Sequence, residues 1–216
     1  MRKSLMTIEG TVTIALLCMM ILICSLPPKA TSCVGRILSL GIANTEDQKV
    51  MAEMMSVLIS ESTGTKVNVV SFKTLDECRE AIRKGELDLY VDYVCSGLLD
   101  VLNGEKVQIA DFHKAYSTVK HMSDKRFSLI WLKPFGYENA SILKAAPEWL
   151  SGIPNQAVCV ARREVLNRFP ILPRLINKLG NKIPNETIAD LQQKQELTVS
   201  VKAFLEDRKM IRWAIQ

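Results

Sequence analysis

The hydrophobic and polar positions of the chain follow two periods from residue 35 onward. Apolar runs predict strands at residues 36–42, 67–72 and 127–132, and strict alternation predicts another strand at residues 87–93. Between the first two strands, apolar residues recur at helical spacing: Val50, Met51, Met54, Met55, Leu58 and Ile59. Successive strand–helix–strand units predict an α/β fold, with a single parallel-dominated sheet and flanking helices.

Sheets of this kind bind ligands outside the carboxyl ends of their strands. Asn44 and Thr45 follow the first predicted strand, Tyr93 and Ser96 follow the alternating one, and Asn139 follows the strand at residues 127–132. Each of these residues also has a purely structural interpretation. Asn44, Thr45 or Ser96 can cap a helix, and Tyr93 can be a half-buried tyrosine at a strand end.

Three further polar features are interpreted as structural. Thr74 and Glu77 have the spacing of a capping box at the start of a helix. Asp88 and Asp92 share one face of the alternating strand, and we expect solvated carboxylates there rather than an acid–base pair. The basic pair at residues 162–163 is expected at a solvated helix end.

The first 33 residues are typical of an export signal. Arg2 and Lys3 precede an apolar stretch at residues 11–26, which is shorter than the roughly 20 residues of a comfortable membrane-spanning helix. The small residues before Cys33 resemble a bacterial lipoprotein cleavage site, which would make Cys33 the lipidated residue. The alternative is an uncleaved anchor helix. The lipidated form and the anchor helix both predict a folded domain at residues 34–216 that is anchored at the periplasmic or extracellular face of the cytoplasmic membrane.

Composition excludes several functional classes. The net charge of +5 comes without a cluster of Lys and Arg on one predicted face, so we expect no nucleic-acid partner. The two histidines and the cysteine spacing suggest no metal site. Cys78, Cys95 and Cys159 leave one disulfide possible in an oxidising compartment, with the pair undetermined. No catalytic or phosphate-binding motif is present, so we predict neither an enzyme nor a cofactor.

Several segments, in consistent order from about residue 37 to 205, resemble the substrate-binding proteins of glycine betaine, choline and carnitine ABC transporters. They are EDQKV at residues 46–50, GELDLYVDY at 85–93, WLxPxGYxN at 131–139, and a C-terminal set that includes RxExL at 162–166. In that family the second block reads approximately GxIDxYxEYTGT. Asp92 therefore stands in place of a glutamate, and VCS at residues 94–96 replaces TGT.

The resemblance implies one lobe of a periplasmic-binding-protein fold of type II. Family members have two lobes that close on the ligand, whereas only residues 140–156 separate Asn139 from Ala157 here, too few to build the second lobe. The resemblance also places Tyr93 in an aromatic cage for a quaternary ammonium group, with a nearby hydroxyl from Ser96. Other family aromatics fall on Ser141 and near residues 155–156, so the ligand site is reduced.

Two functions remain open at this point. The first is the substrate-binding component of an osmoprotectant uptake system, with Tyr93 and Ser96 lining the site and Asn44, Thr45 and Asn139 at its rim. Its partners would be a weakly bound quaternary ammonium compound, an ABC permease and the membrane. The second is a non-transporting interaction module that uses the uncovered face to bind a protein or a second copy of itself.

Overall fold

The computed structural model describes residues 37–105, 107–139 and 147–211. The chain divides into two units, residues 1–32 and 33–216, and all described residues belong to the second. The predicted export signal and Cys33 lie outside the described residues, as does Ser141. None of the helices in the described part of the chain has the length and apolar character needed to cross a bilayer.

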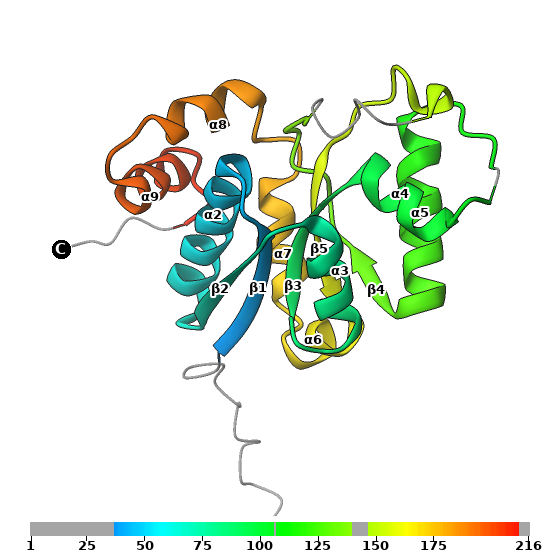
Figure 1. Ribbon diagram of the computed structural model, residues 1–216. Coiled ribbons are helices and arrows are strands. Elements are labelled where there is room, and N and C mark those ends of the chain that lie inside the picture. The colour runs from blue at the N-terminus through cyan, green and yellow to red at the C-terminus, as the bar shows by residue number, and fades with distance from the viewer. Residues whose placement is uncertain (1–36, 106, 140–146, 212–216) are drawn as a thin grey trace, which may run out of the picture. The chain divides into compact units, whose positions relative to one another are not determined.

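One sheet of five strands organises the fold, in the order β2-β1-β3-β5-β4 (Figure 1). β1 runs parallel to β2 and β3, whereas β5 runs antiparallel to β3 and β4, so four strands point one way and only β5 is reversed. The predicted single α/β sheet is therefore confirmed. The strands are β1 (Ile37–Ala43), β2 (Lys66–Phe72), β3 (Leu89–Tyr93), β4 (Leu129–Trp131) and β5 (Ala157–Arg162).

The strands end along two opposite sides of the sheet, and we name each side after the strand termini found there. We call the end at which β1 to β4 finish and β5 begins the carboxyl edge, and the opposite end the amino edge. The helices between the strands are α2 (Glu46–Thr63), α3 (Leu75–Arg83), α4 (Val94–Leu102) and α5 (Phe112–Phe127), with the short 3-10 turn η2 (Glu148–Leu150) before β5. After β5, the last strand, come α6 (Arg163–Arg168), α7 (Leu172–Ile176), the 3-10 turn η3 (Asn177–Leu179), α8 (Asn185–Gln192) and α9 (Leu197–Asp207).

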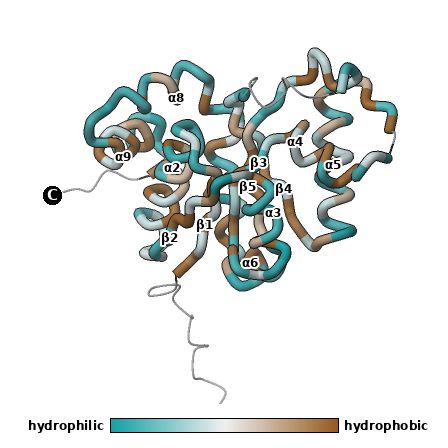
Figure 2. Tube along the Cα trace, in the orientation of Figure 1, coloured by the Kyte–Doolittle hydropathy of each residue, from teal (hydrophilic) through white to brown (hydrophobic). Residues whose placement is uncertain are grey.

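Two hydrophobic cores cover the two faces of the sheet. Leu38, Leu40 and Ile42 of β1 pack with α2, α7, α8 and α9, whereas the second core joins Tyr90, Val158 and Val160 to α3, α4 and α5. The alternation along β3 and β5 thus sends successive side chains to opposite cores, as period two requires. Figure 1 shows α2, α8 and α9 at one side of the sheet and α4 and α5 at the other, and Figure 2 shows how hydrophobic positions concentrate on the strands.

Local sequence signals account for several element ends. Thr74 Oγ1 accepts from the Glu77 amide at 3.2 Å and Glu77 Oε2 accepts from the Lys73 amide at 2.9 Å, which confirms the predicted cap of α3. The strand expected at residues 127–132 is shorter in the structure, where β4 spans only Leu129–Trp131. α5 continues to Phe127 and ends at Ser128, whose backbone is left-handed with a φ of 55°. Arg126 Nη1 donates to the Val101 carbonyl at 2.5 Å and joins the last turn of α5 to the end of α4.

The chain builds a single lobe. Between Asn139 and Ala157, the described residues form only η2 and the loop around it, and an isolated bridge between Glu138 and Gln156 closes this excursion at the sheet. Cys78, Cys95 and Cys159 are all buried free thiols, so the disulfide considered possible among them is not formed.

Candidate ligand site

Asp47 is the centre of a buried polar cluster at the carboxyl edge. It lies in the first turn of α2 and is only 6% exposed. The Tyr93 hydroxyl donates to Asp47 Oδ2 at 2.5 Å, and Asn139 Nδ2 donates to the same oxygen at 3.1 Å. Tyr93 ends β3, α2 follows β1, and Asn139 lies beyond β4. The cluster therefore joins three segments that meet only because their strands end at the same edge.

The tyrosines beside Asp47 stay protonated. Burial raises the pKa of the Tyr93 phenol well above its ordinary value, and the negative charge of Asp47 raises it further. Burial and the Asp47 charge likewise raise the pKa of Tyr137 to about 12. Both phenols are therefore neutral at physiological pH. The side-chain donors to Asp47 described above, the Tyr93 hydroxyl and the Asn139 amide, are uncharged.

The predicted rim residues lie beside this cluster. Asn44 and Thr45 are exposed and precede α2 directly, on the same edge as Tyr93 and Asn139. Thr45 occupies the cap position of α2, but its side chain makes no capping hydrogen bond. Tyr93 is 0% exposed, so its ring is fully covered rather than half-buried. Ligand contact by these four residues stays a prediction.

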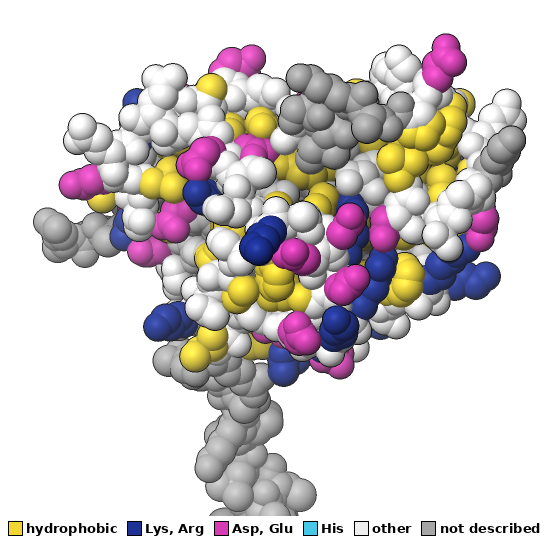
Figure 3. Space-filling model, viewed as in Figure 1, with side chains coloured by type: hydrophobic (Ala, Val, Ile, Leu, Met, Phe, Trp, Pro, Cys, Tyr) yellow, Lys and Arg dark blue, Asp and Glu magenta, His cyan; other side chains and the backbone are white. Residues whose placement is uncertain are grey.

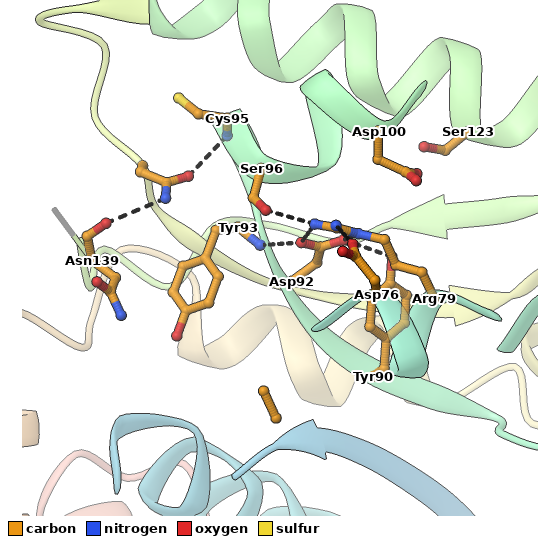
Figure 4. A network of polar contacts seen from close by, with 12 residues as sticks. Asp76, Arg79, Tyr90, Asp92, Tyr93, Cys95, Ser96, Asp100, Ser123 and Asn139 are labelled. Atoms are coloured by element: carbon orange, nitrogen blue, oxygen red, sulfur yellow. Dashed lines mark hydrogen bonds and ion pairs between the residues drawn. The ribbon is translucent and has the colours of Figure 1, made fainter. Parts of the chain in front are cut away.

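Asn155 fixes the position of Asn139. Its Oδ1 accepts from the Cys95 amide at 2.9 Å, and its Nδ2 donates to the Asn139 carbonyl at 3.3 Å (Figure 4). Asn155 is buried, and it stands near the position where the resemblance places a family aromatic. The Asn155 amide therefore ties the loop that carries Asn139 to the start of α4.

Ser96 belongs to a second network, on the other face of the sheet. α4 begins at Val94, so Ser96 lies inside its first turn and is not the cap that the sequence suggested. Its Oγ accepts from Arg79 Nη2 at 2.7 Å (Figure 4). The hydroxyl proton of Ser96 can still be donated to a ligand, and this role also stays a prediction.

Arg79 and Asp92 form the core of this second network. Arg79 Nε donates to Asp92 Oδ2 at 3.0 Å and Arg79 Nη2 to Oδ1 at 2.7 Å, while the Tyr90 hydroxyl and the Tyr93 amide each donate to Asp92 at 2.7 Å. Burial alone would lower the pKa of the Arg79 guanidinium, but the adjacent Asp92 raises it above its ordinary value. The Arg79–Asp92 ion pair ties α3 to the end of β3, directly behind Tyr93.

The expectation of solvated carboxylates on β3 was wrong. Asp92 is 0% exposed and Asp88 is 8% exposed. Asp88 lies at the amino edge, where Arg162 and Arg168 each donate to its Oδ1 at 3.1 Å. Arg162 also donates from Nε to the Leu87 carbonyl at 2.8 Å, so of the basic pair expected at a solvated helix end Arg162 is half-buried, whereas Arg163 is exposed as expected. Both carboxylates are buried because a guanidinium from another element reaches each of them.

Sequence reasoning missed Asp47 and Arg79. Arg79 stands within the apolar stripe of α3, beside Cys78 and Ile82, and a charge in that position indicates a buried partner. Asp47 offers a weaker signal, because an acidic residue in the first turn of a helix has an ordinary explanation in the helix dipole.

The single mixed sheet with its flanking helices matches one lobe of the periplasmic-binding-protein fold. Residues 37–149, more than half of the chain, match the model of the substrate binding domain of the ABC-type glycine betaine transport system. The chain therefore belongs to this family, whose role is to bind substrate for transport. A comparison with curated protein sequences finds no match.

Several solved structures share this fold. A glycine betaine/carnitine/choline ABC transporter protein superposes with a TM-score of 0.69 at 15% identity, covering 81% of this chain and 98% of the other. Apo YehZ from Escherichia coli gives 0.65 at 13% identity, with 80% and 99% covered. Lactococcal OpuAC, closed on glycine betaine, gives 0.51 at 9% identity, with 82% and 100% covered. At these identities the likeness shows the fold alone.

Proposed function

We propose that the protein is the extracytoplasmic substrate-binding component of an osmoprotectant-type ABC uptake system, with a reduced ligand site at the carboxyl edge. The observation that carries this proposal is the Asp47 carboxylate held by Tyr93 and Asn139 at the edge where such sheets bind ligands. Family membership supplies the class of ligand. A quaternary ammonium group offers no N–H donor, so aromatic faces and a nearby negative charge are what can hold it.

The geometry supports weak binding. Tyr93 is covered, and Tyr137 is the partly exposed aromatic next to Asp47. One such cation–π contact contributes roughly 0.5–2 kcal/mol. Asn44, Thr45 and Asn139 supply polar groups for the other end of the ligand. A single lobe encloses little of a ligand, so we expect dissociation constants in the millimolar range.

Calorimetry on the full chain with glycine betaine, choline and carnitine tests this function. We expect heat with at least one of them, and an affinity at least tenfold lower for Asp47→Asn. Asp190→Asn on α8 is the matched control, because it removes a carboxylate from an exposed helix surface and should leave binding unchanged. Absence of heat with all three compounds at millimolar concentration would contradict the proposal.

The proposed membrane attachment has its own test. The chain should fractionate with membranes, through lipid on Cys33 or through an uncleaved anchor at residues 11–26. Cys33→Ala should release it in the first case and leave it bound in the second. A wild-type chain found in the soluble cytoplasmic fraction would contradict both forms, and copurification with an ABC permease would support the transport role directly.

A second candidate function, a non-transporting interaction module, is favoured by an apolar hollow of about 390 Å³. Leu99, Leu102, Val107 and Pro147 line it, and Trp149 lies over it while remaining 41% exposed. This residue belongs to the segment that replaces the second lobe. Figure 3 shows hydrophobic side chains gathered at the upper right, where α4 and α5 lie in Figure 1. Light scattering that shows a stable dimer, lost in Trp149→Ser, would favour this function, and a strict monomer would count against it.

A further inference from the structure

The ring of Tyr93 has no face open to a ligand. Tyr93 is 0% exposed and belongs to the core that packs β1 against α2. Its hydroxyl donates to Asp47 and its backbone amide donates to Asp92 (Figure 4), so both the side chain and the backbone are held. A cation–π contact requires the cation to lie over a ring face, within about 6 Å of the ring centroid. A ligand could reach Tyr93 only by displacing core side chains.

Tyr137 lies beside Asp47 as well, but it is partly open to solvent. It packs against the same core as Tyr93, and its exposure is intermediate. Burial is the main cause of the raised pKa of its phenol, and the charge of Asp47 and a hydrogen bond between the two side chains raise that pKa further. Tyr137 is therefore close to the carboxylate and, unlike Tyr93, accessible from the carboxyl edge.

The segment that carries Tyr137 is fixed by hydrogen bonds from two other elements. The Ala157 amide donates to the Tyr137 carbonyl at 2.9 Å, which continues the pairing with β5 beyond the end of β4. Asn185, the first residue of α8, holds the next residue, Glu138. Its Oδ1 accepts from the Glu138 amide at 2.8 Å, and its Nδ2 donates to the Glu138 carbonyl at 2.9 Å. The ring thus stands on a preorganised backbone, which reduces the ordering cost of binding.

We propose that Tyr137, rather than Tyr93, is the aromatic wall that binds the cationic head group of the ligand. This inference rests on the proposed function, because it assigns a role within the same ligand site. The head group packs on the accessible part of the Tyr137 ring, with the Asp47 carboxylate behind it. The carboxylate adds to the negative potential of the ring face, so the site recognises the positive charge of the head group as well as its shape.

Fluorine NMR on the full chain labelled with fluorotyrosine tests this assignment. The sequence contains four tyrosines, so one substitution to phenylalanine at each position assigns every signal: Tyr90, Tyr93, Tyr116 and Tyr137. Glycine betaine, choline and carnitine are titrated, with sodium chloride at equal ionic strength as the control. We expect the compounds that give heat in calorimetry to shift the Tyr137 signal several-fold more than the Tyr93 signal.

Substitutions at position 137 separate the ring from its hydroxyl. Tyr137→Phe keeps the ring and should retain choline binding. Tyr137→Leu removes the ring and should weaken choline binding by roughly 2- to 30-fold, the factor that corresponds to one cation–π contact. Phe127→Leu is the matched control, because it removes a partly exposed ring at the amino edge and should leave choline binding unchanged.

A neutral analogue of choline, with a tert-butyl group in place of the trimethylammonium group, separates recognition of charge from packing. Tyr137→Leu should weaken binding of choline several-fold more than binding of this analogue, and a variant that merely loses its structure would lose both. Equal losses for the two compounds would overturn the proposal, as would unchanged choline binding in Tyr137→Leu.

The NMR titration and calorimetry distinguish failure of this inference from failure of the proposed function. Heat with any of the three compounds, together with a Tyr93 signal that shifts as much as the Tyr137 signal, overturns the assignment of the wall alone. Heat with an unchanged Tyr137 signal does the same. Absence of heat with all three compounds overturns the proposed function, and the assignment with it.

Discussion

Replacing Asp92 by asparagine removes the charge that compensates Arg79 in the interior, with almost no change in side-chain shape. The carboxylate accepts four hydrogen bonds, two from Arg79, one from Tyr90 and one from the Tyr93 amide. An asparagine offers one acceptor oxygen, and its NH₂ group must face donors. The substitution therefore leaves a guanidinium whose side chain is 6% exposed without its principal anion.

The expected cost follows from that arrangement. Breaking a buried ion pair by removing one partner costs about 3–5 kcal/mol, because the remaining charge stays desolvated. Asp76, whose side chain is 82% exposed, also contacts Arg79 Nη1 at 2.6 Å and retains part of the compensation. We therefore expect about 3 kcal/mol, the lower end of the range. For a chain of this size, that corresponds to a fall in Tm of about 6–12 °C.

Urea unfolding followed by circular dichroism measures this change. Asp190→Asn, on the surface of α8, should stay within about 0.5 kcal/mol of the wild type. The double change Arg79→Met with Asp92→Leu should recover only part of the loss: it removes the unpaired charge, but it leaves the Tyr90 hydroxyl and the Tyr93 amide without their acceptor. If Asp92→Asn alone unfolds within about 1 kcal/mol of the wild type, the ion pair does not stabilise this edge as argued.

Three further substitutions test separate parts of the fold. Gly97→Ala should cost about 1–3 kcal/mol in urea unfolding, because its Cβ would lie 2.3 Å from the buried Trp131 ring. Thr74→Ala should cost about 1 kcal/mol by the same assay through loss of the α3 cap, and Thr74→Ser should restore it. Burial raises the pKa of the Cys159 thiol from 9.0 to about 12, so the folded state favours the protonated form. Its contribution to stability is complete below pH 9 and is lost as the pH rises from 9 towards 12. Cys159→Ala should reduce the alkaline loss by about 1.4 kcal/mol per pH unit in unfolding measured at pH 9 to 11.

The sequence predicted the sheet because burial imposes strict periods on strands and helices. The alternation of Leu89, Val91 and Tyr93 assigned those side chains correctly to one face. The expected order of the strands correctly brought Tyr93 and Asn139 to one edge, where both donate to Asp47. The single lobe was predicted because only residues 140–156 separate Asn139 from Ala157. These predictions concern the type and order of the strands and helices along the chain, which the local pattern of apolar and polar residues indicates.

The polar interior could not be predicted in the same way. The alternation also placed Asp92 on the opposite face from Tyr93. Whether solvent reaches Asp92 depends on α3, which covers that face and brings Arg79 into contact with the carboxylate. Asp88 depended likewise on Arg162, 74 residues away in the chain. A carboxylate on a strand is solvated unless a cation reaches it, and that partner comes from tertiary packing rather than from the strand itself.

The hydrogen bonds that stabilise the carboxyl edge in the absence of a second lobe would also compete with a ligand for the Asp47 carboxylate. Asp47 accepts hydrogen bonds from Tyr93 and Asn139, and Asn139 is in turn held by Asn155, so donors of the protein itself already occupy the carboxylate. A cation that approaches Asp47 must share the carboxylate with these donors, and it gains less from the carboxylate than it would from an unoccupied one. The Tyr93→Phe substitution removes one competitor while keeping the ring. The proposed site therefore gains internal stability at the expense of ligand affinity, which is the balance expected of a binding lobe that functions alone.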